Sequence, residues 1–168
     1  KHYELEMWKQ INKQSEILLN NCTDKKLIVT SAESCTGGMI SSSIVSVSGS
    51  SDIFKSSVVT YSNDMKSKIL NIPIELINEN GAVSEIIANS MASNVLNLMS
   101  ADISIAVTGI AGPNGGTRSK PIGLVYIGIG TKKNIFTKQY LFKGDRLNIR
   151  QETTLEALRF SNKIIESF

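Results

Sequence analysis

Apolar residues recur at the spacing of amphipathic helices in several parts of this chain. The predicted helices cover residues 3–20, 37–47, 63–70, 74–79, 85–100 and about 145–166. In the first of them, Leu5, Trp8, Ile11 and Leu18 lie near one helical face, so we expect that face to be buried.

Shorter runs rich in β-branched residues separate these helices and predict strands. They cover residues 26–32, 56–61, 102–109, 122–131 and 134–142. The last two are joined by the sequence TKKN and therefore predict a β-hairpin. Helices and strands alternate early in the chain and a hairpin comes late, which favours an α/β fold with a mixed sheet covered by helices on both faces.

The composition is typical of a soluble globular protein, and the length predicts a single domain, residues 1–168. Hydrophobic residues make up 41% of the chain, and no run approaches the roughly 18 apolar residues that span a membrane. The net charge of +3 is not gathered in one basic block, so we expect neither nucleic acid nor a membrane as a partner. The amino end does not resemble a secretory signal, and Cys22 and Cys35 do not form a disulfide framework, so we expect a cytoplasmic location.

The single histidine, His2, stands near the amino end of the chain. A Ser-His-Asp site, a Cys-His site and a histidine-rich metal site are therefore not expected. Nucleophilic catalysis by this protein would need a lysine or a carboxylate as its base. We expect no metal and no other cofactor.

The first candidate for chemistry is the stretch TSAESCTGGM, residues 30–39, which follows a predicted strand and opens a helix. Its glycines, Gly37 and Gly38, would let a ligand approach backbone N–H groups closely, and Ser34 and Thr36 add hydroxyl groups. The simpler interpretation is a capped turn in which a hydroxyl only caps the helix.

The second candidate is TGIAGPNGG, residues 108–116, again after a predicted strand. Its glycine spacing fits neither a P-loop nor a dinucleotide-binding fingerprint. It is either a surface loop or a site in which Thr108 and Gly109 lie at the same sheet edge as Ser34, because ligands of α/β folds bind beyond the carboxyl ends of strands.

Two further stretches carry chemistry-bearing side chains. Ser51 lies at a predicted turn, and Tyr61, Asn63 and Lys66 lie where a strand gives way to a helix. A lysine can activate a serine if burial holds it neutral, although an exposed helix face is the alternative for Lys66. Arg146 and Arg150, one turn apart at the start of the last helix, suit a phosphate or carboxylate, or are simply exposed.

Seven stretches together resemble the CinA C-terminal domain family in order and spacing, over essentially the whole chain. They are AESCTGG (32–38), GSS (49–51) followed by Phe54, YSNDMK (61–66), GAVSE (81–85), TGIAGPNGG (108–116), KPIG (120–123) and GDRLNIR (144–150). The family includes nicotinamide mononucleotide amidohydrolases, and the absence of a fused nucleotide domain favours a stand-alone member.

The resemblance implies a three-layer α/β/α sandwich, a homodimer and hydrolysis of the carboxamide of nicotinamide mononucleotide to the nicotinate form and ammonia. It also implies a metal-free site in which Lys66 is the base, Ser51 or Ser34 attacks, and Tyr61 assists. Ser51 is the slightly favoured nucleophile, with Ser34 supporting it. The expected substrate-binding residues are Thr36, Gly37, Gly38, Asn63, Thr108, Gly109 and Arg146.

Two positions depart from the family pattern. Ser48 stands where a proline is common, and Ser56–Ser57 replace a common glycine pair. Because such glycines can let backbone approach a substrate, their loss motivates a second hypothesis, a catalytically weak or inactive nucleotide-binding or interaction module.

Overall fold

The computed structural model describes all residues, 1–168. Its elements, in chain order, are α1 (His2–Lys25), β1 (Val29–Glu33), α2 (Met39–Val45), the 3₁₀ turn η1 (Ser50–Asp52), β2 (Val58–Val59), α3 (Asn63–Leu70), α4 (Ile74–Asn80), α5 (Glu85–Leu98), β3 (Ile103–Gly109), β4 (Leu124–Thr131), β5 (Ile135–Leu141) and α6 (Arg146–Glu166). This order confirms the predicted elements; the 3₁₀ turn was not predicted, and β2 is shorter than expected.

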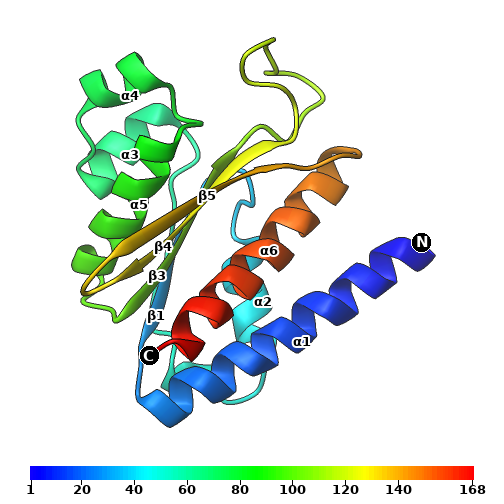
Figure 1. Ribbon diagram of the computed structural model, residues 1–168, viewed down its shortest axis with the longest axis vertical. Helices are drawn as coiled ribbons and strands as arrows, with labels where there is room; N and C mark the ends of the chain where they lie inside the picture. The colour runs from blue at the N-terminus through cyan, green and yellow to red at the C-terminus, as the bar shows by residue number, and fades with distance from the viewer.

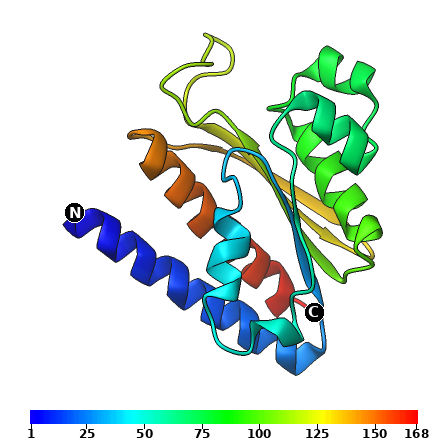
Figure 2. The same cartoon turned by 180° about the vertical axis from the view of Figure 1, so that it is seen from behind.

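Five strands form one mixed sheet in the order β2-β1-β3-β4-β5. Strands β2, β1 and β3 run parallel, whereas β4 and β5 are antiparallel to their neighbours. Helices α1, α2 and α6 cover one face of the sheet, and α3, α4 and α5 lie on the other (Figures 1 and 2). The fold is therefore an α/β/α sandwich, as the resemblance implied.

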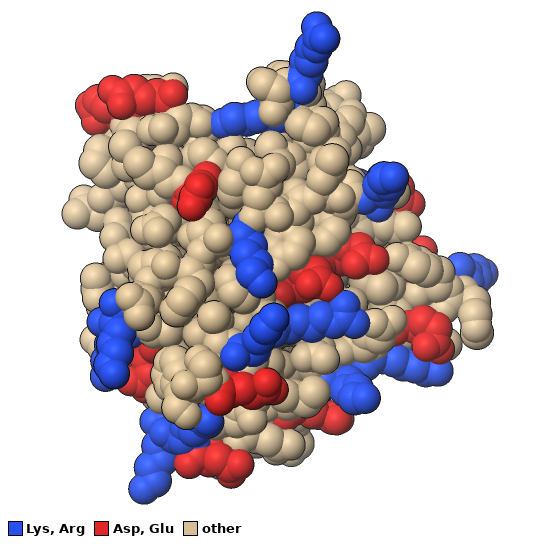
Figure 3. All heavy atoms as spheres, viewed as in Figure 1, with Lys and Arg blue, Asp and Glu red and all other residues tan.

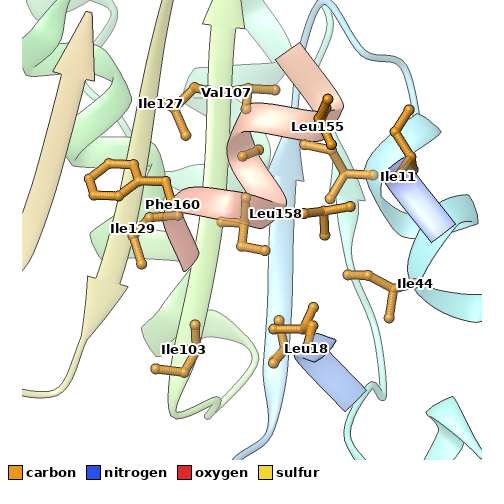
Figure 4. Packing of buried hydrophobic residues seen from close by; sticks show 14 of the residues in the cluster. Ile11, Leu18, Ile44, Ile103, Val107, Ile127, Ile129, Leu155, Leu158 and Phe160 are labelled. Carbon is orange, nitrogen blue, oxygen red and sulfur yellow. The ribbon is translucent and has the colours of Figure 1, made fainter. Parts of the chain in front are cut away.

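Two hydrophobic clusters fill the spaces between the layers. The larger one joins the sheet to the layer of α1, α2 and α6, and in Figure 4 Leu155 and Leu158 of α6 lie between the sheet residue Val107 and Ile11 of α1. The smaller cluster joins the sheet to α5, with Ile87, Met91 and Val95 buried along that helix. Because both faces are covered, every side chain of β1 is buried, including polar ones.

The buried face of α1 differs from the predicted one. Ile11 and Leu18 are buried as expected, but Leu5 and Trp8 are 53% and 40% exposed. Helix α6 packs along the face that carries Met7, Ile11 and Leu18, and that face turns Leu5 and Trp8 toward solvent. The side chains of Ser84 and Asp145 accept backbone N–H groups at the starts of α5 and α6 and cap these helices.

Charged side chains of both signs are interspersed on the face shown in Figure 3, with no continuous basic patch there. Two ion pairs each join residues three positions apart, Lys9 with Glu6 on α1 and Arg159 with Glu156 on α6. None of the helices combines the length and the apolar composition needed to cross a lipid bilayer.

We predict that Leu158→Ala destabilises the protein by about 2–5 kcal/mol, because it removes a fully buried side chain from the larger cluster and leaves a cavity. Urea unfolding followed by circular dichroism measures the effect as a lower midpoint at an unchanged slope. Leu5→Ala is the matched control on the exposed side of α1 and should change stability by less than about 0.5 kcal/mol. Equal effects of the two variants would contradict the packing described.

Candidate active site

The carboxyl ends of the three parallel strands meet at one edge of the sheet. Glu33, the last residue of β1, pairs with Val59 of β2 and with Val107 of β3. The next residues along the three strands, Ser34, Thr60 and Thr108, therefore come to the same edge. This is the edge at which open α/β sheets bind their ligands.

A pocket of about 270 Å³ opens at this edge. Its lining comes from five separate parts of the chain: Ser34, Cys35, Tyr61, Asn63, Lys66, Ala82, Val83, Thr108, Gly109, Ala111 and Arg146. Seven of the residues expected from the sequence are thus brought together: Ser34, Tyr61, Asn63, Lys66, Thr108, Gly109 and Arg146.

Ser34 and Lys66 form a close polar pair inside the pocket. The Nζ of Lys66 lies 2.9 Å from the Oγ of Ser34, although 32 residues separate them in the chain. Lys66 lies on helix α3, which follows β2 in the chain and is capped by the side chain of Ser62. A serine hydroxyl and a lysine amine in hydrogen-bond contact have the geometry of a nucleophile and its base.

Lys66 is buried with no acidic partner. Its side chain is 1% exposed, and it forms no ion pair with any carboxylate. Burial lowers the pKa of Lys66 from 10.5 to about 8, because the charged ammonium loses its hydration and gains no compensating anion. A substantial fraction of this amine is therefore neutral near physiological pH.

Two backbone carbonyls orient the amine of Lys66. The oxygens of Thr60 and Tyr61 lie 2.9 Å and 3.3 Å from the Nζ. A neutral amine has two N–H bonds and one lone pair, so donating to both carbonyls leaves the lone pair aimed at Ser34. In this protonation state, Ser34 is the donor and Lys66 the acceptor, as proton transfer from the hydroxyl requires.

The backbone that follows Ser34 offers unpaired donors. The N–H groups of Cys35 and Thr36 donate to no backbone carbonyl and to no side chain of another residue, although both residues are almost fully buried. Buried unpaired N–H groups are uncommon and suit a developing oxyanion. The thiol of Cys35 is a poor nucleophile here, because burial raises its pKa to about 12.

The rim of the pocket is polar. Arg146, the first residue of α6, donates to the carbonyl oxygen of Gly112 at 2.7 Å and to the hydroxyl of Tyr61 at 2.9 Å. Tyr61 is 61% exposed, and Asn63 lies beside it in the lining. The guanidinium of Arg146 thus sits at the mouth of the pocket, at the start of a long helix, where an anionic group is favourably bound.

The wall opposite Lys66 comes from the end of β3. The hydroxyl of Thr108 donates to the carbonyl oxygen of Ala82 at 2.9 Å and holds the segment before α5 against the strand. A side chain at Gly109 would meet Val125 of β4 at 2.5 Å, so this position needs glycine for the strands to pack. The apolar wall residues Ala82 and Val83 were not predicted individually, although they belong to the GAVSE motif.

Ser51, the favoured nucleophile from the sequence, is not in the pocket. It lies exposed in the 3₁₀ turn, and the chain then bridges at Phe54 to Val29, the first residue of β1. The two ends of β1 are about 15 Å apart at 3.3 Å per residue, and Ser34 follows the other end. The structure therefore does not bring Ser51 to Lys66, and Ser34 takes the position expected of the nucleophile.

Thr36, Gly37 and Gly38 are not among the residues that line the pocket, so their expected contacts with substrate stay a prediction. The hydroxyl of Thr36 turns inward to Glu33, and Gly37 and Gly38 have φ values of 58° and 103°, which let the chain turn back into α2. Arg150 is likewise not a ligand-facing group, because its guanidinium donates to backbone carbonyls of this turn.

The serines that replace the glycine pair do not face the pocket. Ser57 is hydrogen-bonded to Ser41 at 2.7 Å between hydroxyl oxygens, and Ser56 donates to the sulfur of Met99. Neither residue is part of the lining, so these two serines do not form the pocket wall.

A wider hollow of about 770 Å³ lies elsewhere, between α5 and the turn that joins β4 to β5. It is lined mainly by amide and hydroxyl side chains, and its Lys132 pairs with Asp102. None of its hydroxyl groups is hydrogen-bonded to the side-chain amine of a lysine, so it lacks the base that a serine nucleophile needs.

A family model described as the CinA C-terminal domain matches residues 11–165 of this chain. A putative competence-damage inducible protein of Caldicellulosiruptor bescii is 45% identical over 89% of the chain, and a CinA-like protein of Dictyoglomus turgidum is 46% identical over 85%. The chain spans only 36% and 35% of these two relatives, about a third of their length.

Solved structures match nearly end to end. The competence/damage inducible protein CihA from Agrobacterium tumefaciens is 35% identical with a TM-score of 0.88, over 90% of this chain and 93% of that one. The competence or damage-inducible protein from Enterobacter asburiae is 29% identical with a TM-score of 0.89, over 92% of this chain and 98% of that one.

We predict that the buried amine of Lys66 makes stability rise with pH between about 8 and 10.5. In this window the unfolded chain binds a proton that the folded protein has lost, so unfolding becomes less favourable as the pH increases. Lys66→Met removes this titration, so its stability advantage over the wild type should be largest below pH 8 and shrink by roughly 3 kcal/mol by pH 10.5.

Urea unfolding at a series of pH values measures this difference. Lys68→Met, two residues along on the exposed side of α3, is the matched control and should follow the wild type at every pH. If the stability of Lys66→Met and that of the wild type changed with pH in parallel, burial would not lower the pKa of Lys66.

Proposed function

Because this chain belongs to the CinA C-terminal domain family, we propose that it is a nicotinamide mononucleotide deamidase with a Ser/Lys mechanism. It hydrolyses the carboxamide to the nicotinate mononucleotide and ammonia, a reaction of pyridine nucleotide salvage. The observation that carries the proposal is the buried amine of Lys66, 2.9 Å from the hydroxyl of Ser34 and without a carboxylate partner.

In the first half of the reaction, Ser34 attacks the carboxamide carbon while its proton passes to the neutral amine of Lys66. The negative charge on the carboxamide oxygen develops beside the unpaired N–H groups of Cys35 and Thr36. Collapse of the tetrahedral intermediate breaks the carbon–nitrogen bond, and Lys66 returns the proton to the departing ammonia. The product of this half is an ester on Ser34.

In the second half, water attacks the ester carbon with Lys66 again as the base. The proton that Lys66 accepts returns to the oxygen of Ser34 as the carbon–oxygen bond breaks, and the carboxylate product leaves. The reaction consumes one water and needs no metal and no redox step, which agrees with a site built from a hydroxyl, an amine and backbone N–H groups.

The rim of the pocket supports a nucleotide substrate. Arg146 and the start of α6 would hold the 5′-phosphate, and Tyr61 and Asn63 would flank the rest of the nucleotide at the mouth. Tyr61 is the assisting residue expected from the sequence, and its contact with Arg146 links it to phosphate binding. The homodimer and the cytoplasmic location remain predictions.

The alternative of an inactive binding module rested on the loss of the glycine pair. Since Ser56 and Ser57 lie outside the pocket lining, that observation no longer favours it. An inactive module would show a thermal shift with nicotinamide mononucleotide without releasing ammonia, so one assay separates the two functions.

We predict that the wild type releases ammonia from nicotinamide mononucleotide and that Ser34→Ala and Lys66→Ala each reduce kcat by roughly 10³-fold or more, because each removes half of the nucleophile–base pair. A coupled ammonia assay measures the rates, with circular dichroism to confirm folding. Lys68→Ala is the matched lysine control and should keep the wild-type rate.

Ser51→Ala separates the two serines and should keep the wild-type rate, because Ser51 lies outside the pocket. No ammonia from the folded wild type would overturn the proposed activity. An unaffected Lys66→Ala would overturn the Ser/Lys mechanism, and a loss in Ser51→Ala would overturn the assignment of Ser34 as the nucleophile.

We predict that kcat/KM rises with pH and levels off above about 8, because Lys66 must be neutral in the free enzyme to accept the proton of Ser34. Initial rates at low substrate concentration across pH 6–10 measure the profile. Lys66→Arg places a group that stays protonated at this position and should be inactive at every pH. A flat profile over this range in the wild type would contradict the role of Lys66 as the base.

A further inference from the structure

Glu33 is a buried carboxylate that the proposed mechanism does not use. It is the last residue of β1, it precedes Ser34, and its side chain is 0% exposed. No lysine or arginine forms an ion pair with it. A buried charge without a cation is costly unless hydrogen bonds replace its lost hydration, so its surroundings need an explanation.

Five hydrogen bonds surround this carboxylate. Its Oε1 accepts from the hydroxyl of Thr36 at 2.7 Å and from the N–H groups of Gly38 and Ile40 at 3.2 Å and 2.9 Å. Its Oε2 accepts from the N–H of Ser41 at 2.9 Å and from the hydroxyl of the same residue at 2.5 Å. All five donors belong to residues 36–41, so one side chain fixes the whole turn after Ser34 and the first residues of α2.

Arg150 holds the same turn from the opposite side. Its Nε donates to the carbonyl oxygen of Cys35 and a terminal nitrogen to that of Thr36, each at 3.0 Å. In a trans peptide the carbonyl and the following N–H point in opposite directions. The hydrogen bond from Arg150 to the carbonyl oxygen of Cys35 therefore fixes this peptide unit with the N–H of Thr36 pointing away from Arg150.

The geometry points to Glu33 as a positioning residue, which holds the N–H groups of Cys35 and Thr36 beside the hydroxyl of Ser34 so that they receive the oxyanion. This inference rests on the proposed function, because it assigns those N–H groups to the proposed reaction. Glu33 touches no substrate in this role. Glu33 acts through the turn after Ser34. Arg150 binds two carbonyl oxygens of this turn, and Glu33 accepts the hydrogen bonds of its other donors.

The serine cluster around Glu33 extends this support to the neighbouring strand. The hydroxyl of Ser41 contacts those of Ser31 and Ser57 at 3.0 Å and 2.7 Å, as well as Glu33. Ser57, one of the two residues that replace the family glycines, thereby ties the segment before β2 to the carboxylate. Ser57 thus contributes a hydroxyl to the support of the turn and is not part of the pocket lining.

Glu33→Gln tests the role of the charge with little change in size. The amide of glutamine keeps one acceptor oxygen, but an NH₂ group replaces the second carboxylate oxygen. The N–H and O–H groups that donated to that oxygen then face another donor. Asp102→Asn is the matched control: Asp102 also accepts a backbone N–H, from Ile28 at 2.8 Å, but it lies at the far end of β1 from Ser34.

The experiment has two readouts on the whole chain. The first is kcat and KM for ammonia release from nicotinamide mononucleotide. The second is the rate at which a fluorophosphonate modifies Ser34, followed by intact mass. In that reaction the Oγ of Ser34 bonds to phosphorus, fluoride leaves and Lys66 takes the proton, so it needs the same N–H groups but no nucleotide binding. Thermal unfolding reports stability separately.

We expect Glu33→Gln to lower kcat and the labelling rate by roughly 10- to 100-fold with KM nearly unchanged, because oxyanion donors act in the transition state. Asp102→Asn should lower only the unfolding temperature. Ser41→Ala, which keeps the backbone contacts of Glu33, should fold and show a smaller loss of both rates, so the inference stays testable if Glu33→Gln does not fold.

The outcomes separate this inference from the proposed function. Normal rates in folded Glu33→Gln or, where that variant does not fold, in Ser41→Ala would overturn the positioning role. A wild type that is labelled at Ser34 but releases no ammonia would overturn the deamidase activity, while the relative labelling rates still decide the role of Glu33. A wild type that is not labelled at all would overturn both.

Discussion

The burial of one lysine amine against a serine hydroxyl is the constraint on which the site depends. The side chain of Lys66 is 1% exposed and therefore desolvated, and its amine is hydrogen-bonded only to neutral groups. The energetic cost of this burial lowers its pKa to about 8 and supplies a base to a protein that has a single histidine near its amino end. The burial of Lys66 costs stability, and an ionisable group with a shifted pKa in a pocket is typical of functional sites.

The parallel part of the sheet makes this arrangement possible. Strands β1, β2 and β3 end in register, so residues more than 70 positions apart, such as Ser34 and Thr108, meet without any long loop between them. The antiparallel strands β4 and β5 supply none of the lining residues. Their contribution is the packing surface under α6, which carries Arg146 to the rim.

Polar side chains in the buried strand β1 and its surroundings serve the turn after Ser34. Glu33 and Arg150 hold opposite sides of that turn, and the serines near Glu33 continue the network to the segment before β2. A carboxylate surrounded by five donors is satisfied without a cation, which leaves Lys66 without a negative partner that would raise its pKa again.

The order of helices and strands follows from the sequence, because local periodicity decides it. The residue types of a Ser/Lys site were expected from the resemblance to the CinA C-terminal domain family. The tertiary structure decided which serine meets Lys66. GSS and AESC both predict turns, and only the strand register places Ser34 in the pocket, while Ser51 lies in the turn before Phe54, which bridges to the opposite end of β1. It also decided that Arg150 binds backbone, since a contact between residues 115 apart leaves no local pattern.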